Sequence, residues 1–261
     1  MYQKPPHTEF LAFAQTLADH SRSMLLLAAA DKPNVEVKQD GSFVTATDRE
    51  IEASLRHLIT ETYPEHGILG EEFENQNTDA EFVWVLDPID GTAPYIAGIP
   101  VYGSLIALAW KEKPFIGVID HPRTSDRWIG VVNSFAELNG KKIQVRPCHS
   151  LSLAFSTCSN PDFMTEEEKK QFDKVRGRTQ YMQYGGACFS YGVLASGRTD
   201  IAIDGGLKVF DIFAPAAVIS GAGGVVTDWN GHGLNFDNDG TIIAAGDKDR
   251  HMEIIDLLQS N

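Results

Sequence analysis

Apolar residues recur at helical spacing in two segments near the start of the chain. The first runs from about His7 to Ala30 and repeats a large apolar side chain every third or fourth residue, which predicts an amphipathic helix. In the second, Thr47 and Glu50 match a capping box ahead of an apolar stripe. We therefore expect two helices, with Asp48 in the first turn of the second.

Uninterrupted apolar runs predict strands in the middle of the chain. "GILG" stops at Glu71 and Glu72, and "VWVL" stops at Asp87. The runs "GSLIALAW", "PFIGVID" and "RWIGVV" follow, and the "KEKP" between the first two predicts an antiparallel hairpin. Two of the predicted strands therefore end directly in acidic residues.

From about Lys142 the pattern changes to an alternation of strands and helices. The expected strands are "KIQV", "LAFSTCS", "DIAID", "GGVVTD" and "TIIAAG". The expected helices begin after Thr165, run through "CFSYGVLAS" and "DIFAPAAVIS", and end the chain after Asp247. Hairpins followed by alternation predict an α/β (α+β) fold with two lobes, residues 1–140 and 141–261.

Length and composition narrow the class of protein. The 261 residues are 43% hydrophobic, enough for one large domain or two tightly joined lobes. No apolar run approaches the roughly 20 residues of a membrane span, and the N-terminus lacks the basic and apolar regions of a secretory signal. Three cysteines without CxxC spacing, Cys148, Cys158 and Cys188, suggest core residues of a cytoplasmic protein.

The net charge of the chain narrows the kinds of molecule that it is expected to bind. The formal net charge is −14, which argues against nucleic acid as the main partner because phosphate backbones need clustered Lys and Arg. A small phosphorylated metabolite stays compatible with this charge if cations lie between the two sets of negative groups.

Carboxylates recur at the predicted element ends. Any one of them has an ordinary explanation: Asp48 and Asp211 suit helix N-termini, Glu71 and Glu72 suit a solvated loop, and Asp90 before a glycine suits a turn. Side chains from several element ends can nevertheless meet at one point of a fold. We therefore consider these acids together as a candidate site.

The segment "DPIDGT" at 87–92 carries the most chemistry. Pro88 restricts Asp87 to an extended pose, and Gly91 permits a backbone that other residues rarely take. Thr92 is expected to cap the next helix and leave amides directed at an anion. Several carboxylates in one pocket repel one another unless divalent cations are present, and oxygen ligands favour Mg²⁺ or Mn²⁺ over zinc. The pattern indicates a multi-metal site for a phosphoester.

"GEE" at 70–72, "DPIDGT" and the later "FD…GAGGVVTDWNG" together resemble the inositol monophosphatase superfamily. The resemblance covers nearly the whole chain. It implies a layered αβαβα sandwich and a lithium-sensitive phosphatase with two or three Mg²⁺ ions, Mn²⁺ being possible. It also implies a homodimer.

The resemblance also implies ligand roles. Glu71, Asp87 and the carbonyl of Ile89 would hold one metal ion, and Asp87, Asp90 and Asp211 would hold a second. A third, weakly bound ion would use Glu71, with help from an acid upstream.

Further roles concern the phosphate and the water. The amides of Gly91 and Thr92 would bind phosphate, and the Thr92 hydroxyl with Glu71 would orient the attacking water. Asp48, the upstream acid, would also support Thr92, and Lys38 matches a lysine of the family. Water would attack phosphorus in line, without a covalent enzyme intermediate.

Within the superfamily the sequence is most similar to the histidinol-phosphate phosphatases, notably in "YGGACFSYGVLASGRTDIAIDGGLKVFD". Asp204 stands seven residues before Asp211, where the family uses an acid near the leaving group. Two positions depart from the pattern. Ala187 stands where those enzymes carry an aspartate, which would remove a counter-ion for a cationic substrate; alternatively, the residue at 187 serves only helix packing. In addition, "GTAPY" replaces a more usual "GTxxF".

Several alternatives remain at this point. Inositol 1-phosphate is the second substrate; a 3′,5′-bisphosphate nucleotide or fructose bisphosphate would need a second basic pocket, for which no Lys/Arg cluster is evident. A non-catalytic scaffold would not need an acid at every metal position. A dinucleotide-binding fold is disfavoured because "GAGGVV" lacks GxGxxG spacing. The histidines show no metal-binding pairing, and His121 before Pro122 is expected in a loop.

Overall fold

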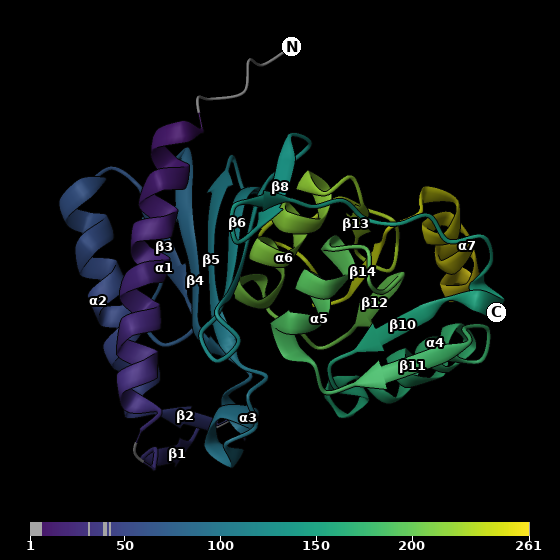
Figure 1. Cartoon of the computed structure of the whole chain (residues 1–261), viewed down its shortest axis with the longest axis horizontal. Coiled ribbons are helices and arrows are strands. Elements are labelled where there is room, and N and C mark those ends of the chain that lie inside the picture. The colour runs from purple at the N-terminus through teal and green to yellow at the C-terminus, as the bar shows by residue number, and fades with distance from the viewer. Residues whose placement is uncertain (1–6, 31, 39–40, 42, 261) are drawn as a thin grey trace.

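The structure is a computed structural model that describes residues 7–30, 32–38, 41 and 43–260. Residues 1–6, which make up most of the N-terminal segment without secretory-signal features, lie outside the described residues. The chain folds into two sheets, one of seven strands and one of five, together with a separate two-stranded hairpin. Helices lie outside and between the two large sheets (Figure 1).

The helices are α1 (Thr8–Ala28), α2 (Ala46–Thr62), α3 (Thr92–Ala97), α4 (Glu166–Arg176), α5 (Ala187–Ala195), α6 (Val209–Gly221) and α7 (Lys248–Gln259). The hairpin is β1 (Val35–Val37) and β2 (Phe43–Thr45). The seven-stranded sheet follows chain order and contains β3 (Gly67–Gly70), β4 (Phe82–Asp90), β5 (Gly103–Trp110), β6 (Lys113–His121), β7 (Asp126–Val131), β8 (Phe135–Leu138) and β9 (Lys141–Lys142). The five-stranded sheet has the order β11-β10-β12-β14-β13 and contains β10 (Phe155–Cys158), β11 (Tyr181–Tyr184), β12 (Ile201–Asp204), β13 (Val225–Thr227) and β14 (Ile242–Ala245).

The elements stack as helix, sheet, helix, sheet, helix. α1 and α2 cover the outer face of the seven-stranded sheet, α5 and α6 fill the space between the sheets, and α4 and α7 cover the far side (Figure 1). Three apolar clusters separate these layers, because each sheet face and helix stripe must be buried against a neighbour. The predicted αβαβα sandwich is confirmed.

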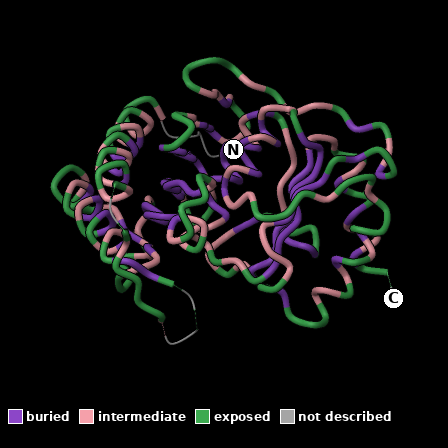
Figure 2. Tube along the Cα trace, turned by 60° about the horizontal axis from the view of Figure 1, so that its bottom comes forward, coloured by how far each residue is buried: buried purple, intermediate pink, exposed green. Residues whose placement is uncertain are grey.

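Burial follows this layering. The buried stretches gather along the strands, whereas the connections between elements are largely exposed (Figure 2). α6 is apolar on nearly every side, with eight buried residues from Ile212 to Ile219, as expected for a helix enclosed by two sheets. Its first turn, which contains Asp211, reaches the edge of this core.

Several sequence predictions hold at the level of single caps. α4 begins after Thr165, as predicted, where Thr165 and Glu168 form a capping box, and α7 begins after Asp247, whose side chain caps it. The "KEKP" hairpin joins β5 and β6 as an antiparallel pair. All three cysteines are buried and free.

Other predictions were wrong in detail. The capping box of α2 uses Thr45 and Asp48, not Thr47 and Glu50, so the helix begins earlier. His121 is the last residue of β6 and is fully buried, not in a loop. The sequence pattern does not predict the hairpin β1–β2 or the strands β8 and β11, because each is short and lacks a long apolar run.

The lobe boundary near residue 140 stays a prediction. "KIQV" was expected to open the second lobe, but only Lys142 of it forms strand, as part of β9 in the first sheet. In the layer between the two sheets, side chains from residues 1–140 and from residues 141–261 pack into one apolar cluster. The two segments therefore share their largest core.

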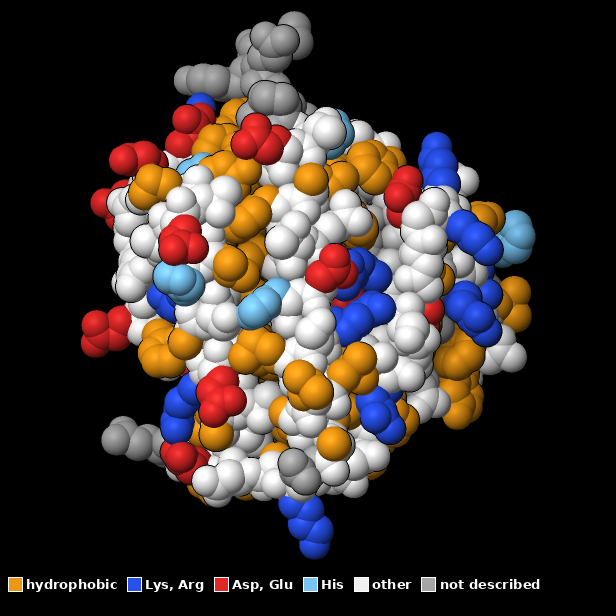
Figure 3. Space-filling view, turned by 60° about the vertical axis from the view of Figure 1, so that its left-hand side comes forward, with side chains coloured by type: hydrophobic (Ala, Val, Ile, Leu, Met, Phe, Trp, Pro, Cys, Tyr) orange, Lys and Arg blue, Asp and Glu red, His pale blue; other side chains and the backbone are white. Residues whose placement is uncertain are grey.

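Charge is mixed on the face formed by α1 and α2. Acidic side chains are interspersed there with Lys and Arg (Figure 3). Among the described residues, no helix is long and apolar enough to cross a membrane.

Candidate functional site

An irregularity at the end of β4 creates the site. Asp87 pairs with Leu105 of β5 and Asp90 pairs with Gly103, so Pro88 and Ile89 together face one residue, Ser104. Side chains alternate along a regular strand, so positions 87 and 90 would point to opposite faces. The extra residue shifts that alternation and brings both aspartates to the same side.

Ser104 fixes this bulge. Its hydroxyl donates to the Pro88 carbonyl at 2.7 Å and lies 2.6 Å from the Ser21 hydroxyl of α1. Proline suits a bulge because it has no amide hydrogen to offer the ladder. The Ile89 side chain packs in the cluster beneath α1 and α2, which leaves the aspartates on the opposite side, toward α5 and α6.

Three aspartates meet at this point. Asp87 and Asp90 come from β4, and Asp211 comes from the first turn of α6, more than 120 residues later in the chain. One carboxylate oxygen from each lies within 4.8 Å of the others. The acids that the sequence placed at separate element ends are thus brought together by the fold.

The protein holds two of these carboxylates by one oxygen each. Asp90 Oδ2 accepts a 2.6 Å hydrogen bond from the Cys188 amide, and Asp211 Oδ2 accepts one of 2.6 Å from the Lys208 amide. Asp87 is 1% exposed, and its Oδ1 has no hydrogen-bond partner within the described part of the chain. A buried charged group in that position needs a partner.

The electrostatics fit a divalent cation at this cluster. Burial raises the pKa of Asp87 well above its usual range, and Glu71, Asp90, Asp211 and Asp48 raise it further. Burial likewise raises the pKa of Asp211, with Asp90 adding to the effect. Hard oxygen donors around an unpartnered buried carboxylate fit a divalent cation.

Glu71 and Glu72 follow β3 beside this cluster. Lys38 Nζ lies 2.9 Å from Glu71 Oε1 and 2.8 Å from Glu72 Oε1. Burial raises the pKa of Glu71 to about 7, against the opposing effect of Lys38. Burial would lower the pKa of Lys38, but the two glutamates raise it to about 12. Lys38 is thus a counter-ion for the acids at the edge of the site.

A buried ion pair that the sequence reasoning missed supports this loop. Arg56 donates to Glu52 Oε1 at 2.8 Å and to the carbonyls of Phe73 and Glu74, while Glu52 Oε2 accepts from the Glu72 amide at 2.8 Å. The signal in the sequence is an acid and an arginine four residues apart within the buried stripe of α2.

Asp48 lies in the first turn of α2, as predicted. Its Oδ2 accepts from the Thr45 amide at 2.8 Å and from the Thr45 hydroxyl at 2.5 Å. Its buried Oδ1 has no partner among the described residues. Burial raises the pKa of Asp48 and the Thr45 contacts oppose that effect. The support that Asp48 was expected to give Thr92 stays a prediction.

The turn after Asp90 differs from expectation in one respect. Gly91 has φ of 81°, and a Cβ there would come within 2.9 Å of the Val101 carbonyl, so glycine is required. Gly91 is also the N-cap of α3, which makes Thr92 the first helical residue and not the cap. The Thr92 hydroxyl donates to the Ile89 carbonyl at 3.0 Å.

The two residues predicted to contact the substrate lie on different elements. Ala187 opens α5, beside Gly91, with φ of 44°. Asp204 ends β12 and is 2% exposed; its Oδ1 accepts from the Ser159 amide and its Oδ2 from the Tyr191 hydroxyl, both at 2.6 Å. Burial raises the pKa of Asp204 to about 6 in spite of these hydrogen bonds. Both oxygens of Asp204 are therefore engaged inside the protein.

Comparisons with known proteins show the family of this chain and similar folds. The model of the inositol monophosphatase family matches residues 7–261. A bifunctional phosphatase IMPL2 of Arabidopsis thaliana, described as chloroplastic, is 38% identical over 259 residues, which cover 96% of this chain and 75% of that protein.

Two other matches extend the comparison. A histidinol-phosphatase of Mycobacterium tuberculosis is 31% identical over 233 residues, covering 81% of this chain and 89% of the relative. The solved structure of an inositol monophosphatase from Zymomonas mobilis superposes with a TM-score of 0.89 at 33% identity, covering 98% of this chain and all of the other.

Proposed function

We propose that this chain, which belongs to the inositol monophosphatase family and is a metal-dependent phosphatase, is a Mg²⁺-dependent histidinol-phosphatase that converts L-histidinol phosphate and water to L-histidinol and phosphate. The observation that carries the metal-dependent chemistry is the cluster of Asp87, Asp90 and Asp211. Divalent ions bound there would offset phosphate charge and make water a better nucleophile.

The residues around the cluster have complementary roles in this proposal. Two or three Mg²⁺ ions would be held by Asp87, Asp90, Asp211, Glu71 and the Ile89 carbonyl. Asp87 is the most enclosed of the three clustered aspartates, so its charge would depend most on bound cations. A buried carboxylate between two cations loses the repulsion that otherwise raises its pKa.

The phosphate and the water are placed by the loops. The amides of Gly91 and Thr92 face the phosphate in this proposal. The Thr92 hydroxyl gives its hydrogen to the Ile89 carbonyl, so its oxygen is available to accept a hydrogen bond from water. Glu71 Oε offers a second acceptor, and Lys38 holds that side chain in place.

The choice of histidinol phosphate rests on sequence likeness. The segment from Tyr184 to Asp211 resembles the histidinol-phosphate phosphatases, and a histidinol-phosphatase is among the relatives. Ala187 carries no charge, and both oxygens of Asp204 are hydrogen-bonded inside the protein. This chain therefore offers less negative charge to a cationic leaving group than the pattern of the histidinol-phosphate phosphatases does. That observation favours inositol 1-phosphate as the second candidate. A homodimer, lithium sensitivity and a cytoplasmic location stay predictions.

A matched pair of substrates tests the proposal. Phosphate release is measured with L-histidinol phosphate and inositol 1-phosphate at equal Mg²⁺, with Asp90→Asn as the inactive reference. We expect the larger kcat/KM for L-histidinol phosphate. A larger kcat/KM for inositol 1-phosphate would make that compound the preferred substrate. Hydrolysis without metal would contradict the proposed metal-dependent mechanism.

Ala187→Asp provides an internal check on substrate recognition. Aspartate tolerates the left-handed backbone of this position better than alanine does, so the change is expected to fold. It should lower KM for L-histidinol phosphate and leave KM for inositol 1-phosphate unchanged or higher. An equal change in KM for both substrates would show that position 187 does not recognise the leaving group.

A further inference from the structure

We propose that Tyr191 is a positioning residue for the metal ligand Asp90, acting through helix α5. This inference rests on the proposed function, because it assigns Asp90 to the metal. It concerns a hydroxyl in the interior, one turn of helix away from the residue that contacts Asp90.

The first observation is the contact between α5 and Asp90. The Cys188 amide, in the first turn of α5, donates to Asp90 Oδ2 at 2.6 Å. This amide has no partner within a helix, so the aspartate satisfies it. The positive end of the helix dipole also favours the carboxylate. The Cys188 amide thereby holds Asp90 Oδ2, and one carboxylate oxygen of Asp90 lies in the cluster with Asp87 and Asp211.

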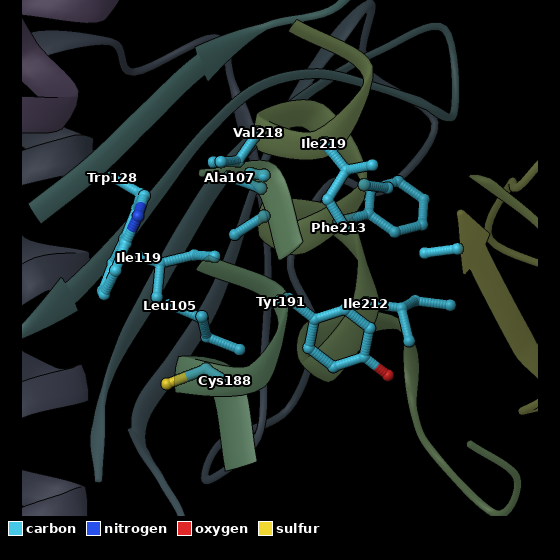
Figure 4. Packing of buried hydrophobic residues seen from close by; sticks show 14 of the residues in the cluster. Leu105, Ala107, Ile119, Trp128, Cys188, Tyr191, Ile212, Phe213, Val218 and Ile219 are labelled. Carbon is cyan, nitrogen blue, oxygen red and sulfur yellow. The ribbon is translucent and has the colours of Figure 1, made fainter. Parts of the chain in front are cut away.

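The second observation is an anchor one turn further along α5. Tyr191 follows Cys188 by three residues, and the two side chains point away from each other (Figure 4). Its hydroxyl donates to Asp204 Oδ2 at 2.6 Å, and Asp204 in turn binds the Ser159 amide. Tyr191 is 2% exposed, and a buried hydroxyl bonded to a carboxylate is among the stronger neutral-donor contacts.

These contacts tie the two sheets together at the metal cluster. Asp90 belongs to β4 of the seven-stranded sheet, whereas Asp204 belongs to β12 of the five-stranded sheet. Cys188 and Tyr191 lie between the sheets in the same apolar cluster, near Leu105 of β5 and Ile212 of α6 (Figure 4). Helix α5 therefore spans the interval from one sheet to the other.

The geometry gives Asp204 a role different from substrate contact. With both oxygens engaged, Asp204 holds α5 in register, and α5 holds Asp90. Residues that orient a metal ligand commonly change metal affinity by about 10- to 100-fold when they are altered. Since Tyr191 acts one step further away, we expect an effect near the lower end of that range.

The test uses Tyr191→Phe, which keeps the buried ring and removes the hydroxyl. Mn²⁺ binding is measured by electron paramagnetic resonance without substrate, and amide exchange of residues 185–190 is measured by mass spectrometry without metal. We expect Mn²⁺ to bind about 10-fold more weakly and the segment to exchange faster. At saturating metal, KM for the phosphoester should stay close to the wild-type value.

Tyr63→Phe is the matched control. It removes a hydroxyl that donates to a carboxylate, Glu9 Oε1 at 3.2 Å, in an exposed contact between the end of α2 and the first turn of α1. We expect this variant to keep the wild-type Mn²⁺ affinity. If both variants weaken Mn²⁺ binding equally, the effect is a general loss of stability and the positioning role is wrong.

Other outcomes separate this inference from the proposed function. Unchanged Mn²⁺ affinity and exchange in Tyr191→Phe would overturn the inference alone. A raised KM with unchanged Mn²⁺ affinity would also overturn it, and would return Asp204 to a role in substrate binding. Wild-type protein that binds Mn²⁺ but hydrolyses no phosphoester would overturn the proposed function instead. Wild-type protein that binds no Mn²⁺ would overturn both.

Discussion

Asp87 and Asp120 are two buried aspartates of the same sheet with opposite surroundings. Asp120, on β6, is 0% exposed and accepts hydrogen bonds from Arg22 at 2.9 and 2.8 Å and from Arg127. Asp87, on β4, is 1% exposed and is surrounded by further acids. Burial is equal, so the difference lies in whether the chain provides the counter-ion.

This difference separates a structural acid from a candidate ligand. Arg22 and Arg127 come from α1 and β7, and they enclose Asp120 with fixed positive charge. In the proposed function, a divalent cation would take the comparable role at Asp87. Lys38 forms an intermediate case, since it pairs with Glu71 and Glu72 at the rim and does not pair with Asp87 in any contact of the described residues. Four predictions test the comparison.

The largest effect is expected from Asp90→Asn. The change removes a charged ligand next to Asp87, so hydrolysis of the preferred phosphoester should fall by about two to three orders of magnitude, as for loss of a group that stabilises transition-state charge. Phosphate release at saturating Mg²⁺ measures this loss. Stability without metal should rise or stay equal because one repulsive charge is gone. Retention of more than a tenth of the activity would contradict the assignment.

Asp120→Asn should lower the stability of the protein and leave most of its activity. It leaves two arginines partly buried without their shared partner, which is expected to cost about 3 kcal/mol of the free energy of unfolding. Denaturant titration measures the loss, and the variant should keep most of its turnover at low temperature. A stable but inactive Asp120→Asn protein would show that the two aspartates are not functionally distinct.

Metal removal should affect only one of the two aspartate environments. Mg²⁺ at 100 times its dissociation constant should add about 2.7 kcal/mol to the free energy of unfolding. Thermal melts with Mg²⁺ and with a chelator measure this increment. It should persist in Asp120→Asn and largely vanish in Asp90→Asn. Equal increments in both variants would place the ion elsewhere.

The smallest effect concerns His121, next to Asp120. Burial lowers the pKa of His121 to about 4; Asp126 and Asp120 oppose this shift and Arg22 adds to it. Because the folded pKa lies below the unfolded value, the stabilisation is complete above about pH 6.5 and is lost as the pH falls toward 4. We expect a loss of about 2 kcal/mol between pH 7 and pH 5.

The control for that prediction is a histidine on the surface. His57 has a side chain that is 70% exposed, so His57→Gln should leave the pH dependence of unfolding unchanged. His121→Phe should flatten it because phenylalanine does not titrate, and loss of the Nε2 atom breaks no hydrogen bond among the described residues. The same slope in all three proteins would assign the pH dependence to other groups.

The residue pattern by itself determined the local features of this protein. The caps at Thr165 and Asp247, the hairpin between β5 and β6, and the acidic segment "DPIDGT" are all readable from the sequence. Such features depend on side chains within a few residues of one another, which is the range that periodicity and capping rules describe. The motif order also sufficed for the family and the layered fold.

Only the tertiary structure decided how the acids are partnered. The bulge that turns Asp87 and Asp90 to one side depends on Ser104 of the neighbouring strand. The bonds from Cys188 to Asp90 and from Arg22 to Asp120 each join residues 98 positions apart. No local pattern encodes such contacts, because they arise when separate layers pack together. The sequence therefore identified the acids, and the packing separated those that have a counter-ion from those that need one.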